Sequence, residues 1–164
     1  MVVSMWEAFI YSFIATVGFG VLFQAPRHTL ATSGFIGAIG WLVFYYMRSF
    51  LGYDSFYANL CATIVLSLLS ELAARVFKQP ATVYVIPGII PIVPGLGMYK
   101  GMAQMIENHY EQGVSILLTA GMDAAAIALG MMFIASFFRV LKLSKDRERL
   151  KALLKVQDDD CSNG

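Results

Sequence analysis

The architecture of this chain follows from the stretch Val85-Ile86-Pro87-Gly88-Ile89-Ile90-Pro91-Ile92-Val93-Pro94-Gly95. Apart from three prolines and two glycines it is wholly apolar, which favours a membrane environment. Each proline lacks an amide N–H and clashes with the carbonyl four residues earlier, so a continuous helix is not expected. The residues before the prolines, Ile86, Ile90 and Val93, are expected to be extended. Non-helical backbone at membrane depth persists only where protein buries it or where it lines a polar cavity.

A membrane segment broken in this way has two interpretations. Discontinuous helices form substrate and ion sites in transporters, whereas a proline kink or a helix-to-helix loop needs no ligand. We expect the break to line a translocation path. A half-helix can begin after the second Pro-Gly pair, and its free N–H groups favour an anionic group. The residues expected on this path are Pro87, Gly88, Pro91, Pro94, Gly95 and Tyr99.

Composition places the whole chain in a bilayer. Its 164 residues are 58% hydrophobic and 14% charged, with a mean hydropathy of +0.66, whereas a soluble domain carries about a quarter charged residues. A chain of this length cannot bury so much apolar surface in a core of its own. Apolar segments are expected at about 5–23, 30–47, 56–77, 81–105 and 114–138. We therefore predict an all-α integral membrane protein with about five transmembrane segments in residues 1–140, the fourth of them broken.

The tail, residues 141–164, is basic. Its Lys and Arg residues alternate with leucines, which predicts an amphipathic helix at the anionic cytoplasmic leaflet, followed by a disordered end. Because cytoplasmic segments collect Lys and Arg, the tail is predicted to lie on the cytoplasmic side of the inner (plasma) membrane. The N-terminus is predicted to lie on the opposite side. A re-entrant proline segment would instead put both termini in the cytoplasm. A tail tethered to membrane lipid and balanced by acids argues against nucleic-acid binding.

Two carboxylates and one arginine are candidate functional groups. Asp123 has no basic residue three or four positions away, and an intramembrane carboxylate is a functional-site hypothesis by default. Glu71 and Arg75 lie four residues apart, so they can pair on one helix face. We interpret Asp123 and Glu71 as candidates for proton coupling; a buried structural carboxyl and a structural ion pair are the alternatives. Arg27 is a candidate contact for a substrate carboxylate, with lipid phosphate as the alternative.

Two segments resemble the threonine/serine exporter family. The first is Pro87-Gly88-x-x-Pro91-x-x-Pro94-Gly95, followed by Met98-Tyr99. The second is Gly20-Val-Leu-Phe-Gln-Ala-Pro-Arg27, followed by Gly34-x-x-Gly37-Ala-Ile-Gly40-Trp41. It is similar to the family's "F-N-A-P-R … G-A-I/L-G-W" segment, with Gln24 where Asn is usual. The resemblance covers about residues 7–138 and is to the short, YjjB-like subunit, equivalent to the C-terminal half of the full-length exporter.

The resemblance implies a membrane subunit of a secondary transporter that exports threonine and serine, or small dicarboxylates such as succinate. It also implies a partner subunit equivalent to the N-terminal half; a homo-oligomer is a further possibility. The chain has no Walker loop, so the proton gradient is the expected energy source. We expect no metal, cofactor or enzymatic activity, because no metal-ligand spacing or nucleophile elbow is present. The alternative is a structural or assembly membrane protein with no transport path of its own.

Overall fold

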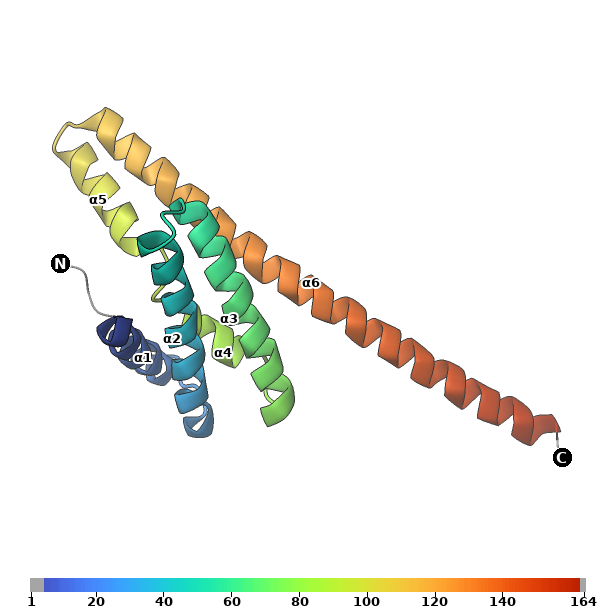
Figure 1. Cartoon of the computed structure of the whole chain (residues 1–164). Coiled ribbons are helices and arrows are strands. Elements are labelled where there is room, and N and C mark those ends of the chain that lie inside the picture. Colours follow the sequence, from blue (N-terminus) through green and yellow to red (C-terminus); the bar gives the residue numbers. More distant parts are fainter. Residues whose placement is uncertain (1–4, 163–164) are drawn as a thin grey trace.

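The computed structural model describes the backbone of residues 5–162 and the side chains of residues 5–141. Every regular element in this part of the chain is a helix (Figure 1). The order is α1 (Met5–Leu22), α2 (Arg27–Ser49), α3 (Ser55–Phe77), α4 (Thr82–Ile89), α5 (Gly95–Ile106) and α6 (Tyr110–Ser162). By length and composition, α1, α2, α3 and the part of α6 up to Leu141 could each cross a membrane. The predicted all-α membrane class is confirmed.

Glycines bring α1, α2 and α3 close together. A Cβ added at Gly34 of α2 would lie 2.7 Å from the side chains of Phe13 and Val17 of α1. On the other side of α2, a Cβ at Gly40 would lie 2.9 Å from the Leu66 side chain of α3. Lipid is as apolar as the helices, so close packing of this kind replaces the hydrophobic effect as the force that holds them together.

The short helix α4 packs one face against the bundle and contacts α1, α2 and α3. Its residues Tyr84, Pro87 and Gly88 are buried. Pro87 lies inside the helix, so Ile86 is helical, and Ile90 has helical angles of φ −56° and ψ −42°. The prediction of extended backbone at Ile86 and Ile90 was therefore wrong. A proline removes only one hydrogen bond from so short a helix, and burial against three neighbours offsets that loss.

Residues 90–94, which hold the second and third prolines, are not helical. The N–H of Ile92 donates to the carbonyl of Ile89 at 2.9 Å, and the N–H of Gly95 donates to the carbonyl of Val93 at 2.8 Å. Pro94 precedes the first residue of α5 with φ −75° and ψ 44°. These tight turns redirect the chain from the buried α4 to the exposed α5.

Helices α3 and α6 run parallel. Three contacts in increasing order along both helices establish this: Ser55 with Asp123, Thr63 with Gly130, and Arg75 with Phe138. The chain leaves α3 at one end of the bundle and enters α6 beyond the other end (Figure 1). Residues 78–109, which connect them, therefore carry the chain back along the length of the bundle through α4, the non-helical residues 90–94 and α5.

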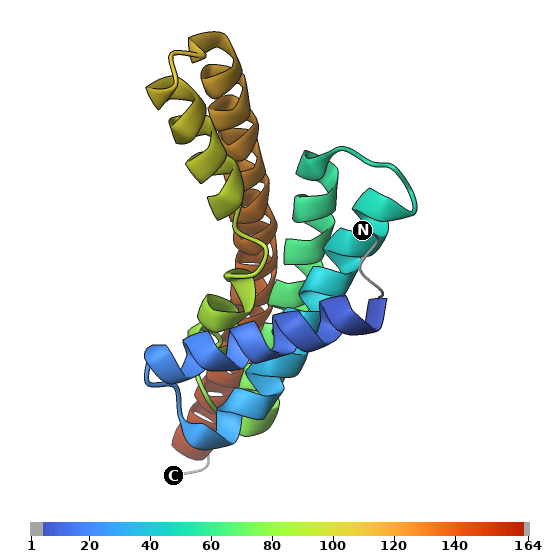
Figure 2. The same cartoon turned by 90° about the vertical axis from the view of Figure 1, so that its left-hand side faces the viewer.

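Helix α5 packs only on α6 within the described residues. Gly101 and Gly113 allow this contact, since a Cβ at Gly101 would lie 3.2 Å from the Gly113 carbonyl oxygen. Figure 2 shows the α5–α6 hairpin extending past the ends of α2 and α3. Helix α6 continues through Ser162, well beyond the predicted segment end at residue 138. The predicted amphipathic face of the tail lies outside the described side chains, and the domain division and the disordered end stay predictions.

Candidate functional site

One face of α3 carries a line of polar side chains, which we call the polar stripe: Ser55, Asn59, Thr63, Ser67 and Ser70. Successive members are three or four residues apart, so they follow one face of the helix. All except Ser55 are at most 4% exposed. The sequence-based prediction missed this feature. A polar residue at every fourth position of an otherwise apolar segment was the signal that could have revealed it.

Asp123 of α6 lies at one end of the polar stripe. It is 7% exposed, and the Ser55 hydroxyl donates to its Oδ2 at 2.8 Å. The Asn59 amide extends the contact by donating to Ser55 Oγ at 3.4 Å. A cavity of about 520 Å³, here the Asp123 cavity, opens beside this cluster and is also lined by Arg48 and Asp54. The partner of Asp123 thus comes from another helix, and it is a neutral hydroxyl.

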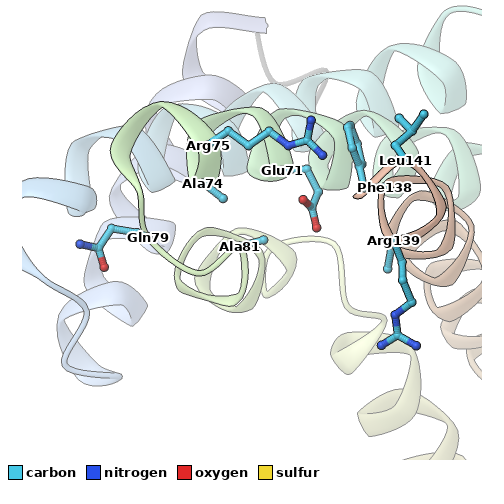
Figure 3. A pocket seen from close by; sticks show the side chains of 9 residues that line it. Glu71, Ala74, Arg75, Gln79, Ala81, Phe138, Arg139 and Leu141 are labelled. Carbon is cyan, nitrogen blue, oxygen red and sulfur yellow. The ribbon is translucent and has the colours of Figure 1, made fainter. Parts of the chain in front are cut away.

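Glu71 lies at the other end of the polar stripe, in a cavity of about 900 Å³ that we call the charged cavity. Arg75, Gln79 and Arg139 also line it. In Figure 3 the Arg75 side chain reaches from α3 toward Phe138, and the Glu71 carboxylate is directed into the space between α3 and α4. Arg139 of α6 is directed away from both. Both residues line this cavity, with the Glu71 carboxylate directed toward α4 and the Arg75 guanidinium directed toward Phe138.

The predicted ion pair between Glu71 and Arg75 was wrong: in the described part of the chain, no contact within 4.0 Å joins their charged groups. The guanidinium carbon of Arg75 instead lies 4.4 Å from the centre of the Phe138 ring. A guanidinium stacked on an aromatic ring gains cation–π attraction and keeps its N–H groups free at its edge. The contact of Arg75 with Phe138 of α6 therefore competes with an ion pair between Arg75 and Glu71 inside α3. It leaves the Glu71 carboxylate and the Arg75 guanidinium accessible to a ligand.

The residues predicted for the translocation path lie in several places, and none lines either of these two cavities. Pro87 and Gly88 are buried within the helical bundle. Pro91 lines a cavity of about 300 Å³ with residues of α1 and α2. Tyr99 is 71% exposed on α5, and Arg27 is exposed at the start of α2. Pro94 and Gly95 join the break to α5.

The family model for the threonine/serine exporter, ThrE, matches residues 8–137. The chain belongs to the threonine/serine exporter family. The match runs from the first turns of α1 to Phe137 in α6. It includes every residue that lines the Asp123 cavity, and all those that line the charged cavity except Phe138, Arg139 and Leu141. This family comprises transporters, so the prediction that the chain is not an enzyme is confirmed.

Two relatives show how much of the family this chain represents. A threonine/serine exporter of Corynebacterium glutamicum is 26% identical over 119 residues, which cover 73% of this chain and 24% of the relative. An uncharacterized protein of Haemophilus influenzae is 26% identical over 134 residues, which cover 74% of this chain and 43% of the relative. The chain therefore spans less than half the length of either relative. No solved structure matches the chain significantly.

Proposed function

We propose that this chain is the membrane subunit of a secondary transporter that exports threonine and serine together with a partner subunit. The observation that carries the proposal is the charged cavity, which Glu71 and Arg75 both line without pairing. Ionisable residues in membrane segments are functional-site candidates by default. A ligand that carries both charges could contact Glu71 and Arg75 together.

The charges of the cavity fit a zwitterion better than a dianion. A free α-amino acid carries an ammonium group, which complements Glu71, and a carboxylate, which complements the guanidinium of Arg75 by charge-assisted hydrogen bonds. Succinate carries two carboxylates, and one of them would face Glu71 with the same charge, which is unfavourable. Threonine and serine are therefore favoured over small dicarboxylates as the exported metabolites.

The proposed energy source is the proton gradient, with Asp123 as the group that carries the proton. Asp123 is buried and its hydrogen-bond partner is the neutral Ser55 hydroxyl, and these two observations support this assignment. The non-helical residues 90–94 would allow α4 and α5 to move relative to each other as the translocation path opens. The proline motif is therefore proposed to be part of that path.

The partner subunit and the membrane lipid are proposed to cover the apolar outer surface. Large side chains of α5 and α6 are more than half exposed, for example Ile106 at 82%, Leu118 at 65% and Phe133 at 66%. The relatives extend well beyond the part that this chain matches. We therefore propose that this surface is covered by a partner subunit equivalent to the part of the relatives that this chain does not match.

Counterflow in proteoliposomes tests the proposal. The chain and its partner subunit would be reconstituted together in vesicles. The vesicles would be loaded with unlabelled threonine and exposed to traces of labelled threonine, serine or succinate. We expect labelled threonine and serine to accumulate at least tenfold faster than succinate. Accumulation of succinate alone would overturn the substrate assignment. If no solute accumulates, the alternative of a structural or assembly protein is favoured instead.

A further inference from the structure

We propose that the polar stripe of α3 is a proton route through the buried part of this protein, from Asp123 at one end to Glu71 at the other. This inference rests on the proposed function, and it names the residues between the two carboxylates. Ser55 and Glu71 are 16 residues apart, which corresponds to about 24 Å along a helix. That distance covers most of the about 30 Å hydrocarbon core of a bilayer.

Unpartnered polar atoms inside the bundle carry the inference. Asn59 Oδ1, Ser67 Oγ and Ser70 Oγ are buried on the polar stripe and have no hydrogen-bond partner among the described residues. The fully buried Tyr84 of α4 has an unpartnered hydroxyl as well. A buried polar atom without a partner costs about 1–3 kcal/mol, and buried water is the usual partner in such positions. Three costly groups on one helix face point to a line of water molecules between the carboxylates.

The polar stripe runs between the two cavities, and α6 packs against its middle. Ser55 lines the Asp123 cavity, and Glu71 lines the charged cavity. Between them, a Cβ at Gly130 of α6 would lie 3.0 Å from Thr63 Cβ and 3.2 Å from the Leu60 carbonyl oxygen. This close helix contact covers the stripe at Thr63.

The transfer conserves protons and needs no other reactant. One proton passes from the Asp123 carboxyl to the hydrogen-bonded chain, each water or hydroxyl hands on one proton as it receives one, and one proton arrives at the Glu71 carboxylate. In the described arrangement the Ser55 hydroxyl donates to Asp123, so this hydroxyl has to rotate and accept from the protonated carboxyl before the proton moves on. The other charged groups that line the two cavities are Arg48 and Asp54 beside Asp123, and Arg75 and Arg139 beside Glu71.

The test separates proton movement from substrate exchange in the reconstituted complex. Threonine–threonine counterflow requires no net proton transfer, whereas uptake driven by an imposed pH gradient does, and a pH-sensitive dye inside the vesicles records the protons. The test variant is the double substitution Ser67→Ala and Ser70→Ala. The matched control is Ser33→Ala on α2, a buried hydroxyl that donates to the Leu30 carbonyl of its own helix at 2.9 Å.

We expect the double variant to lose at least tenfold in gradient-driven uptake and in the dye signal, while counterflow and the thermal midpoint stay close to wild type. The control should keep all of these. Wild-type proton movement in the double variant would overturn the route along the stripe. If the unsubstituted complex exchanges threonine but moves no protons, the route and the proposed proton coupling both fail, while the proposed transport of threonine and serine stands. If it does neither, the proposed function fails as well.

Discussion

Gln24, in the connection between α1 and α2, has a φ of +55°, which places it in the left-handed region. A residue with a Cβ pays about 1–2 kcal/mol for this conformation, and Asn tolerates it better than most. The chain adopts this conformation at Gln24 because it must reverse direction within the few residues between α1 and α2.

Replacing Gln24 with Asn should therefore stabilise the protein by about 0.5 kcal/mol, since Asn is the better tolerated side chain at positive φ. Thermal unfolding of the detergent-solubilised protein measures this change. Gln24→Ala is the control, because alanine keeps the strain and should give no gain. An Asn variant that melts at or below the wild-type temperature would show that the backbone strain is not the limiting factor.

Asp123 is the residue whose substitution should separate proton coupling from substrate exchange. Asn at position 123 keeps the size of the side chain and can accept the Ser55 hydrogen bond, but it cannot carry a proton. We expect Asp123→Asn to flatten the pH profile of export while counterflow persists. Asp54→Asn is the control, because Asp54 lines the same cavity but is exposed. An unchanged pH profile in the Asp123 variant would place this carboxyl among the structural groups.

At this scale, the sequence indicates which side chains can reach each other. It does not show which of the possible contacts forms. The four-residue spacing of Glu71 and Arg75 is compatible with a pair, yet the structure places Arg75 over Phe138. Phe138 is 63 residues away in the sequence and is brought there only by the parallel packing of α3 and α6. Asp123 could be identified as a buried candidate, but its partner Ser55 depends on the same packing.

At the scale of the elements, the apolar length of each segment predicts a helix well, because helices satisfy their own backbone groups in lipid. Local proline rules are weaker predictors, because tertiary burial competes with them. Pro87 lies inside α4 since that helix is enclosed by α1, α2 and α3. Pro91 and Pro94 lie in the non-helical stretch instead. Sequence rules alone could not separate the first proline from the other two.

The double substitution Pro91→Ala and Pro94→Ala tests the break between α4 and α5. Alanine restores two N–H donors and favours helix, so α4 and α5 should join into a straighter helix. We expect transport to be abolished while membrane insertion, measured by extraction and yield, stays at the wild-type level. Pro87→Ala is the comparison, because this proline is already helical and its replacement should leave the break in place. Full transport by the double variant would remove the break from the translocation mechanism.

The whole molecule has an asymmetric distribution of basic groups. The start of α2 and the end of α3 lie at one end of the bundle (Figure 1), which places Arg27, Arg75 and Lys78 there. Arg139 contributes to the same end, since it shares the charged cavity with Arg75. Arg48 and Lys100 of α5 lie toward the opposite end. Lys and Arg collect on the cytoplasmic side, so this charge distribution supports a cytoplasmic position for the charged cavity and the tail.

Reporter fusions test this topology. A reporter placed after Gly164 should read as cytoplasmic, and a tag before Met1 should be accessible from the opposite side. This expectation counts as crossings the four helices that are long and apolar enough to span a membrane, and adds as a fifth the return of the chain between the parallel helices α3 and α6. A tail found outside would contradict the charge argument. Two cytoplasmic ends would show that the proline segment does not cross.

The measurement that tests the central claim most directly is threonine counterflow by the reconstituted complex carrying Glu71→Gln. Counterflow needs no net proton movement, so it reports on substrate recognition in the charged cavity alone. Glu111→Gln, at the exposed start of α6, removes the same charge outside that cavity and serves as the control. We predict that Glu71→Gln lowers the counterflow rate at least tenfold, while Glu111→Gln keeps it and both variants melt like the wild type. Equal counterflow by the two variants would contradict the claim that the charged cavity binds the exported amino acid.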